Sequence, residues 1–497
     1  MNKLIFKDKA IRELFSVDDP FEFARTIDGK IYRESANRTT KQFFHDGESY
    51  FIKYHGGIGW REIFKNISKL QLPTIGALRE WNAINHLNRA EIKCPEQIAF
   101  GYKGLNPANS KSFIITKALK NSISLEESLK DGKFQALPVS TKIKIINQVA
   151  DICRKMHESG MNHRDLYLCH FHINEEMRLE EGIYIIDLHR AQIRKKVPRR
   201  WLEKDIGGLL HSSLGYNFGE KELYRFLEVY FLMSTKELTI KNKDFLFRCI
   251  NRAFSMYLKP KIQACSFKVS KNAENFGFIK KFYSSSRAIY QKKYFTKDLE
   301  LLILNLEKVM KSGKVIKKEA GHFIIHTEFN NKRIYIKKYQ IKNTFHYIRR
   351  LCFKTRALNA WQAIQWYRAA GIRTIEPLCI VENFNFLSST SSYLVTYQNK
   401  GSRLDKLQIN DENGLKIASS IGSFFRRLSW IRFNHGDVKS SNFHYGDGKL
   451  TVFDLDIAKR YLTNFAFLRK RKKDIKRILK SFKSEKKFIS LLENRIK

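Results

Sequence analysis

The chain of 497 residues is too long for one small module, and at about 150 residues per domain it predicts roughly three domains, or two if each has two lobes. Hydrophobic residues make up 43% and charged residues 28%, with only 25 Gly and 8 Pro, which excludes a disordered or collagen-like chain. The formal net charge of +43 leads us to expect an acidic partner, namely nucleic acid, an anionic membrane surface or a phosphorylated substrate. A basic surface that serves solubility is the alternative.

The seven cysteines are scattered and never spaced Cys-x-x-Cys, which argues against a zinc site or a disulfide framework and favours a reducing compartment. Charged residues interrupt the N-terminal segment where a signal peptide needs its apolar run. No stretch reaches the ~18 uncharged apolar residues of a membrane span. We therefore expect a cytosolic or peripheral protein.

The first half of the chain is repeated in the second half. Residues 77–84 (ALREWNAI) reappear as residues 357–364 (ALNAWQAI) with five identical positions of eight. Tyr50-Phe-Ile-Lys53 recurs as Tyr335-Ile-Lys337, and His163-Arg-Asp165 recurs as His435-Gly-Asp437, in the same order. The sequence therefore predicts two copies of one fold.

Each copy begins with alternating β-branched and aromatic residues, as in 49–53 and 332–337, and continues with helical periodicity. This order predicts an α+β fold in which each copy has a small β-rich N-lobe and a larger helical C-lobe. Residues 259–295 lack strong periodicity and repeat Lys and Ser. They are the predicted linker between a first domain, 1–258, and a second domain, 296–497.

In the first copy, His163-Arg-Asp165 precedes an apolar run that ends in Asp187. This layout is typical of a kinase, in which Asp165 would orient or deprotonate the attacking hydroxyl and Asp187 would hold the magnesium that bridges the ATP phosphates. Lys53 and Glu80 upstream predict a salt bridge that aims the ammonium at the α and β phosphates. A solvated strand lysine and an exposed helix charge are the alternatives for these two residues.

In the second copy, residues 435–442 match the pattern His-x-Asp-x-Lys-x-x-Asn, and Asp454 ends the next apolar run. Asp437 is the predicted catalytic carboxylate, and Lys439 would neutralise the transferring phosphoryl group. Asn442 and Asp454 would supply the oxygen ligands that magnesium prefers. A loop with a capping Asp and a solvated Lys is the alternative.

Each copy departs from the full kinase pattern. His170 stands where an Asn ligand is expected, and imidazole is a poor magnesium ligand, so a single-metal or rearranged site is an option. Ala360 takes the place of Glu80, so Lys337 lacks its expected helix partner. Neither copy has a Gly-x-Gly-x-x-Gly loop, and residues 38–40 are candidates for covering the phosphates in the first copy.

Four segments of the first copy resemble the lipopolysaccharide core heptose(I) kinase family of Gram-negative bacteria, within about residues 25–250: 57–66, 162–171, 186–192 and 199–205. The resemblance implies a protein-kinase-like fold that transfers the γ-phosphate of ATP to the first heptose of the inner core. Members of this family carry His at the position of His170, so the resemblance implies that His170 belongs to the metal site.

The second copy is similar to the wider lipopolysaccharide kinase family, through residues 356–361, 370–374, 435–442 and 453–456. Members of this second type often lack the helix glutamate, so Ala360 is compatible with activity. The two resemblances together imply three pairs of roles: catalysis by Asp165 and Asp437, magnesium binding by Asp187 and Asp454, and ATP binding by Lys53 and Lys337.

The resemblance also points to residues outside these motifs. Asp205 would anchor the backbone of the catalytic loop, unless it is a helix N-cap. Arg190, Arg199 and Arg200 would contact phosphate or carboxylate on the glycolipid, unless they form a solvated basic face.

We therefore expect two tandem protein-kinase-like domains that use ATP and Mg²⁺ to phosphorylate the inner-core glycolipid of lipopolysaccharide, the first domain at the first heptose and the second at another core sugar. The protein would be peripheral on the cytoplasmic face of the inner membrane, held by anionic lipid. Three alternatives are one active domain with a second that only binds or positions, a protein or antibiotic kinase of the same fold, and a nucleic-acid-binding protein with coincidental motifs. No nucleic acid is expected as a partner, because the chain has no recognised binding module.

Near the C-terminus, residues 469–487 combine many Lys and Arg with apolar residues at helical spacing: Ile475, Ile478, Leu479 and Phe482. This pattern predicts a basic amphipathic helix that lies on an anionic leaflet. The alternative is a helix whose apolar stripe packs on the large lobe while its charges are solvated.

Overall fold

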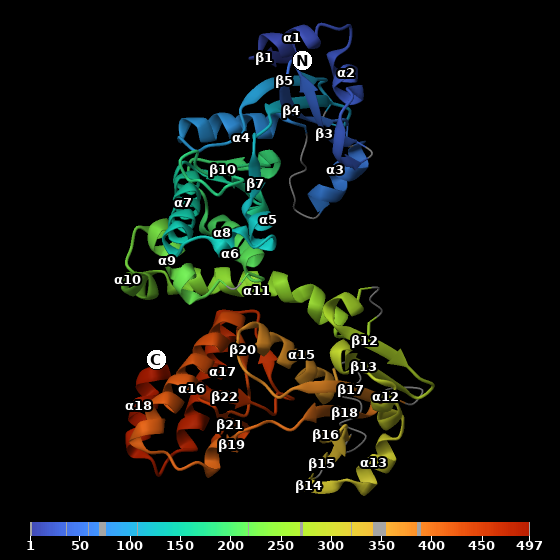
Figure 1. The fold of residues 1–497 in the computed structure, drawn as a ribbon, viewed down its shortest axis with the longest axis vertical. Helices are drawn as coiled ribbons and strands as arrows, with labels where there is room; N and C mark the ends of the chain where they lie inside the picture. The colour runs from blue at the N-terminus through green and yellow to red at the C-terminus, as the bar shows by residue number, and fades with distance from the viewer. Residues whose placement is uncertain are drawn as a thin grey trace. The chain divides into compact units, whose positions relative to one another are not determined.

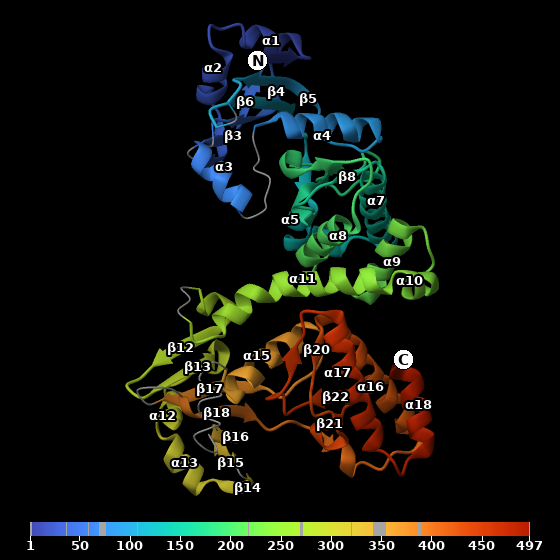
Figure 2. The same ribbon diagram turned by 180° about the vertical axis from the view of Figure 1, so that it is seen from behind.

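In a computed structural model the chain forms two compact units, Met1–Ala253 and Phe254–Lys497. Each unit consists of an antiparallel sheet followed by a mainly helical part (Figures 1 and 2). The structure describes residues 2–35, 37–57, 59–68, 76–106, 108–216, 218–268, 272–319, 321–340, 354–384 and 389–496.

The first unit begins with a six-stranded antiparallel sheet in the order β1-β5-β6-β4-β3-β2. Its strands are β1 Asn2–Phe6, β2 Lys30–Ser35, β3 Arg38–His45, β4 Glu48–His55, β5 Gln97–Lys103 and β6 Lys111–Lys117. Its helices are α1 Lys9–Leu14, α2 Pro20–Thr26, α3 Gly59–Ser68 and α4 Leu78–Arg89. Helices α1 and α2 share a buried apolar core with the sheet, and α4 packs on β5 and β6.

The helical part of the first unit contains α5 Leu125–Lys130, α6 Lys133–Ala136, α7 Val139–Glu158, α8 Arg199–Ser213, α9 Glu220–Phe231, α10 Thr235–Lys241 and α11 Lys243–Ala264. Short strands and 3-10 turns run between these helices: β7 Ser122–Ser124, β8 Met161–Asn162, η1 Leu168–His170, β9 Phe171–Asn174, β10 Tyr184–Ile185, η2 Leu188–Arg190 and β11 Gln192–Ile193. The pairs β8–β11 and β9–β10 fix the two loops that carry Asp165 and Asp187.

The second unit has a seven-stranded antiparallel sheet in the order β12-β13-β17-β18-β16-β15-β14. Its strands are β12 Phe278–Phe282, β13 Ser286–Gln291, β14 Lys314–Glu319, β15 His322–Phe329, β16 Lys332–Gln340, β17 Pro377–Phe384 and β18 Ser389–Tyr397. Its accompanying helices are α12 Lys297–Leu304, α13 Leu306–Ser312 and α15 Arg356–Ala369. Like α4 in the first unit, α15 packs on the sheet, against β17 and β18.

The predicted linker, residues 259–295, is wrong for the residues that the structure describes there, 259–268 and 272–295, because these belong to the second unit. They include the end of α11 and the strands β12 and β13, and β13 pairs with β17. Ala288, Ile289 and Tyr290 are consecutive and fully buried, so β13 lacks the alternation of a half-buried strand. The sequence pattern therefore gave no sign of it.

The helical part of the second unit repeats the order of the first. It contains β19 Ser402–Arg403, η5 Leu404–Lys406, α16 Asp411–Ile431, β20 Phe433–Asn434, η6 Ser440–Asn442, β21 Phe443–Gly446, β22 Lys449–Val452, β23 Lys459–Arg460, α17 Asn464–Lys480 and α18 Lys486–Ile496. The pairs β20–β23 and β21–β22 frame Asp437 and Asp454 as the corresponding pairs frame Asp165 and Asp187.

The basic C-terminal segment forms α17 and the start of α18. Of the predicted apolar stripe, Ile478 and Phe482 are buried and Ile475 and Leu479 are half-buried, so the stripe packs within the unit, as the second of the two sequence hypotheses predicts. Most of the lysines on this segment are exposed. Among the described residues no helix is long and apolar enough to cross a bilayer, and the six described cysteines are unpaired.

Candidate active sites

In the first unit, a buried carboxylate holds the loop that carries Asp165. Asp205, in the middle of α8, accepts hydrogen bonds from the backbone N–H of His163 at 2.6 Å and of Arg164 at 2.9 Å, each on a different oxygen. These bonds hold Arg164 in the left-handed region, at φ 75°. Asp205 is therefore a loop anchor, as predicted, and not a helix cap.

Asp165 lies in this loop with a cation on its carboxylate. Nη1 of Arg190 contacts both of its oxygens, at 2.9 and 2.8 Å. Nδ1 of His170 lies 2.7 Å from the carbonyl oxygen of Asp165. A carbonyl only accepts, so Nδ1 of His170 donates this hydrogen bond.

Lys53 joins the sheet to the helical part of the first unit. Its ammonium lies 2.6 Å from Oε1 of Glu80 on α4 and 3.2 Å from Oδ1 of Asp187, so the expected Lys53–Glu80 salt bridge is present. Both side chains are largely buried, which excludes the solvated alternatives. Burial lowers the pKa of Lys53, but Glu80 and Asp187 raise it by more, so the ammonium stays charged.

Asp187 adopts φ 60° at the turn into η2. Burial raises the pKa of its carboxyl, but a 2.7 Å hydrogen bond from Nδ1 of His189 and the charge of Lys53 hold the pKa well below its ordinary range. The second oxygen of Asp187 lies 3.7 Å from Nε2 of His170. The imidazole of His170 and the carboxylate of Asp187 therefore face one another across the two loops.

The second unit holds its loop with a residue that the sequence did not single out. Asp474, on α17, accepts hydrogen bonds from the backbone N–H of His435 at 3.0 Å and of Gly436 at 3.1 Å, both on one oxygen. Gly436 has φ 85°, the conformation that Arg164 adopts in the first unit. Asp474 follows Asp437 at nearly the spacing at which Asp205 follows Asp165, a signal hidden by the surrounding lysines.

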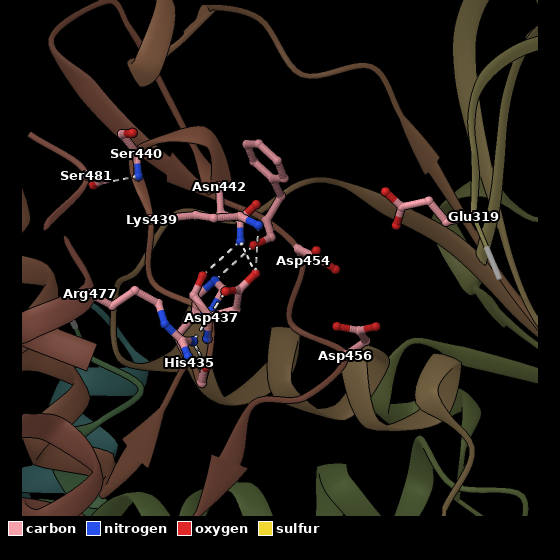
Figure 3. Close-up of polar contacts among 12 residues, drawn as sticks. Glu319, His435, Asp437, Lys439, Ser440, Asn442, Asp454, Asp456, Arg477 and Ser481 are labelled. Carbon is pink, nitrogen blue, oxygen red and sulfur yellow. Dashed lines mark hydrogen bonds and ion pairs between the residues drawn. The ribbon is translucent and has the colours of Figure 1, made fainter. Parts of the chain in front are cut away.

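Asp437 lies among cationic and amide groups in the second unit (Figure 3). Nζ of Lys439 is 3.1 Å from one carboxylate oxygen, and Nη1 of Arg477 is 3.2 Å from the other. The amide nitrogen of Asn442 donates to the carbonyl of Asp437 at 2.8 Å and to its carboxylate at 3.1 Å. Arg477, also on α17, was not predicted from the sequence.

Lys337 has a different partner from Lys53. Its ammonium lies 2.5 Å from Oδ1 of Asp454 and 3.7 Å from Oδ2 of Asp456. Burial raises the pKa of Asp454, but Lys337 lowers it by more, to about 2. Asp456 is thus the second carboxylate near Lys337, as Glu80 is near Lys53, and it is itself contacted by Arg356, at the start of α15, at 2.5 Å.

A cavity of about 640 Å³ lies between the sheet and the helical part of the second unit. Its polar wall contains five of the predicted residues, listed here: Lys337, Asp437, Lys439, Asn442 and Asp454. Ile324, Ile364 and Leu394 supply apolar wall. Its volume and its mixture of apolar wall with convergent charges are those of a small-molecule site.

Comparison with known proteins shows the family of the chain. The model of the lipopolysaccharide kinase (Kdo/WaaP) family matches residues 24–230 and 307–493, most of both units. The chain belongs to this family. It is therefore a phosphotransferase, and as a kinase it uses ATP.

Two curated relatives and one solved structure can be compared with this lipopolysaccharide kinase. The lipopolysaccharide core heptose(I) kinase WaaP of Escherichia coli is 42% identical over 231 residues, 46% of this chain and 87% of the relative. WaaP of Pseudomonas aeruginosa is 37% identical over 234 residues, again 46% and 87%. A structure described as WaaP in complex with acyl carrier protein is 31% identical, covers 51% of this chain and 99% of that chain, and has a TM-score of 0.44.

The loops of the two units carry oxygen atoms of the kind that magnesium takes as ligands, on Asp187, Asn442 and Asp454. Within the described ranges, no three His, Cys, Asp or Glu side chains are grouped to hold an ion. Magnesium commonly takes one or two protein ligands and completes its shell with phosphate and water. In the second unit the amide nitrogen of Asn442 is engaged by Asp437, which leaves its oxygen and Asp454 as ligand atoms.

Proposed function

We propose that the chain is a tandem pair of protein-kinase-like domains, each transferring the γ-phosphate of ATP to a sugar of the lipopolysaccharide core. The sites of the two units support this, because each places a strand lysine next to the aspartate that follows the catalytic loop. These pairs are Lys53 with Asp187 and Lys337 with Asp454. The first unit would be the heptose(I) kinase.

The observation that carries this assignment is the Lys53–Glu80 pair beside Asp187, which matches the phosphate-binding arrangement of kinases. The motifs through which the first unit resembles heptose(I) kinases surround this pair and Asp165 in the sequence. In this proposal Lys53 binds the ATP phosphates and Glu80 orients it.

Asp165 would orient the acceptor hydroxyl and take its proton as the phosphoryl group leaves ATP. Asp187 and His170 would hold magnesium in the first unit, and Asn442 and Asp454 in the second. Bound magnesium neutralises charge on the phosphates. Arg190 covers Asp165 in this structure, so the acceptor hydroxyl must share that carboxylate with a guanidinium.

The second unit is proposed to be a kinase for a different core sugar. Asp437, Lys439, Asn442 and Asp454 all line one cavity, and Asp474 anchors the loop as Asp205 does in the first unit. A second unit that only binds or positions the glycolipid is the competing hypothesis. The retained cavity and its complete polar wall favour activity.

We also propose that the protein works at the cytoplasmic face of the inner membrane, where its glycolipid acceptor is anchored. The net charge of +43 and the exposed lysines of α17 support attraction to anionic lipid.

The proposal is tested with Asp165→Ala and Asp437→Ala in the full chain, expressed in a deletion strain whose core oligosaccharide is analysed by mass spectrometry. We expect Asp165→Ala to remove the phosphate of the first heptose and Asp437→Ala to remove a different one. Each variant is the control for the other, because it carries the same change in the other unit. Heptose phosphorylation that persists at a near-normal level in Asp165→Ala contradicts the first assignment, and a wild-type core in Asp437→Ala favours the binding or positioning role.

A further inference from the structure

The two units place a cation on the catalytic aspartate from different positions in the chain. In the second unit Lys439, two residues after Asp437 in the catalytic loop, lies 3.1 Å from its carboxylate. In the first unit the residue two positions after Asp165 is Tyr167, an uncharged side chain. The cation there is Arg190, whose Nη1 lies 2.9 and 2.8 Å from the two oxygens of Asp165. The first unit therefore obtains from another loop the charge that the second unit has within its catalytic loop.

The short strand pairs of the two units show that these positions are equivalent. Strand β8 pairs with β11, and β20 pairs with β23 in the same register. Arg190 lies two residues before β11, and Ile457 lies two residues before β23. Tyr167 and Lys439 are each the fifth residue after β8 and β20. Each unit therefore has one basic residue at this pair of positions, and the two units have it at opposite members of the pair.

The second unit has a further cation on its aspartate, and the first has none. Arg477, three residues after the loop anchor on α17, lies 3.2 Å from the carboxylate of Asp437. The residue three positions after the loop anchor on α8 is Gly208, which has no side chain. Among the described residues Arg190 is the only salt-bridge partner of Asp165. Removing Arg190 thus leaves this carboxylate without a bound cation.

The guanidinium of Arg190 has donors that Asp165 does not use. A guanidinium carries five N–H donors in a planar fork, and only Nη1 contacts the carboxylate. Within the described ranges Nε and Nη2 of Arg190 form no hydrogen bond. The side chain is 37% exposed, so these donors are accessible to a substrate. Their planar arrangement matches the oxygens of a phosphoryl group.

Phosphoryl transfer brings the γ-phosphate next to the carboxylate that Arg190 contacts. A hydroxyl that donates to Asp165 has its oxygen about 2.7 Å from the carboxylate and attacks the phosphorus from about 3–3.5 Å, so the phosphorus comes within about 6 Å of Asp165. As the acceptor oxygen bonds to phosphorus, the bond from phosphorus to the bridging oxygen of ADP breaks, and the hydroxyl proton passes to Asp165. Negative charge is spread over the three other oxygens of the phosphoryl group during this step.

We propose that Arg190 is a catalytic residue of the first unit, which bridges Asp165 and the transferring phosphoryl group and neutralises the charge on that group. It does in the first unit what Lys439 would do in the second. The inference rests on the proposed function of the first unit as a kinase, but not on the identity of its acceptor. It differs from the expectation from the sequence, in which Arg190 binds an anion on the glycolipid, because the structure places the guanidinium on the catalytic carboxylate.

The first test is hydrolysis of ATP in the absence of an acceptor. The parent chain is the full chain with Asp437→Ala, so that the second unit does not contribute. We expect Arg190→Gln to lower kcat for hydrolysis about hundredfold, equivalent to about 2.7 kcal/mol, with KM for ATP within about threefold of the parent chain. Water replaces the acceptor in this assay, so a residue that only binds an anion on the glycolipid leaves kcat unchanged. An unchanged kcat overturns the inference.

The second test is transfer from labelled ATP to purified lipopolysaccharide core. We expect Arg190→Gln to lower kcat for transfer by a similar factor, while KM for the acceptor stays within about threefold of the parent chain. A raised KM with the kcat of the parent chain overturns the inference, because Arg190 then binds the acceptor. A raised kcat also overturns it, because the guanidinium then only blocks Asp165.

Two further variants separate the charge from the structure of the loop. Arg190→Lys keeps a cation, as the second unit does with Lys439, so we expect its kcat to exceed that of Arg190→Gln at least tenfold. Equal kcat values in these two variants overturn the neutralising role. Arg248→Gln is the matched control, because it removes an arginine of the same unit whose carboxylate partners are Glu203 and Asp244. We expect its kcat to stay within twofold of the parent chain, and a loss as large as that in Arg190→Gln overturns the inference.

Failure of the proposed function gives a different result. If the parent chain hydrolyses ATP but transfers no phosphate to lipopolysaccharide core, the heptose(I) assignment fails, and hydrolysis by Arg190→Gln still decides the role of Arg190. If neither hydrolysis nor transfer by the parent chain exceeds that of the same chain with Asp165→Ala, both the proposed function of the first unit and the role of Arg190 are overturned.

Discussion

Asp205 and Asp474 anchor equivalent loops, but they do so with different atoms, and this predicts unequal effects of the same substitution. In the first unit His163 and Arg164 donate to separate oxygens of Asp205. In the second, His435 and Gly436 donate to one oxygen of Asp474. An Asn side chain has one acceptor oxygen, so it can keep both bonds in the second unit and only one in the first.

The difference can be worked out from these bonds. In Asp205→Asn one buried N–H loses its acceptor, which costs about 1–3 kcal/mol of local stability, and the other hydrogen bond is weakened because its acceptor is no longer charged. We expect the loop to lose about 3 kcal/mol of stability in all. In Asp474→Asn both bonds remain in weaker form. Burial also raises the pKa of Asp474, so removing its charge recovers part of that desolvation, and we expect about 1 kcal/mol. The gap of about 2 kcal/mol is roughly thirtyfold in an opening equilibrium.

Hydrogen exchange followed by mass spectrometry of the full chain measures this, because peptides report each unit separately. A single melting temperature would not, since a chain of two units does not unfold in one step. We expect peptides around 163–168 in Asp205→Asn to exchange much faster than peptides around 435–440 in Asp474→Asn. Equal loss of protection, or greater loss in Asp474→Asn, would refute the hydrogen-bond reasoning.

Three further predictions concern charge. Glu80→Gln should lower kcat/KM for ATP at least tenfold, equivalent to about 1.4 kcal/mol, because Lys53 then pairs only with Asp187. Initial-rate kinetics measure kcat/KM, and an unchanged value contradicts the role of Glu80 in orienting Lys53. Burial lowers the pKa of His55 from 6.5 to about 3. The free energy of unfolding of the first unit therefore keeps the full contribution of neutral His55 above pH 6.5. It loses that contribution as the pH falls toward 3, by up to about 1.4 kcal/mol per pH unit. In His55→Gln the free energy of unfolding of the first unit should therefore fall less steeply as the pH is lowered from 6.5. The stability of the first unit is measured from the oxidation of the buried Met156 at increasing urea concentrations, and Met310 in the second unit is the control. A slope against pH equal to that of wild type counts against this role of His55. Replacing five exposed lysines of α17 with Gln should release the protein from anionic vesicles in a sedimentation assay without speeding hydrogen exchange in peptides of α17. The five are Lys470, Lys472, Lys473, Lys476 and Lys480. Unchanged partitioning at physiological salt leaves α17 a packing helix only.

The sequence predicted what depends on residue type and order along the chain. The repeat of 77–84 at 357–364 indicated two copies of one fold, and the residue types of Lys53 and Glu80 were enough to predict their salt bridge. The salt-bridge prediction is confirmed, because a strand lysine and a helix glutamate leave recognisable patterns in the sequence.

What the sequence did not predict depends on three-dimensional proximity. Asp474 and Arg477 lie in a run of lysines that reads as a surface helix, and only the packing of α17 brings them to the loop of Asp437. The ion pair of Arg356 with Asp456 joins residues about a hundred positions apart, with no local signal. β13 was not predicted for the same reason. It lies between β12 and β17 and is buried on both faces, so its residues do not alternate between polar and apolar.

Helix α11 has a consequence for how the two halves of the polypeptide can be separated. The boundary between the units, after Ala253, falls inside this helix. Before the boundary, Arg252 packs against Gly207; beyond it, Ala264 and Cys265 join the apolar cluster around Trp361. Proteases cut exposed, extended segments, so limited digestion should not release the halves at this point. Fragments for separate expression therefore need to overlap, with 1–264 and 243–497 each retaining the whole helix.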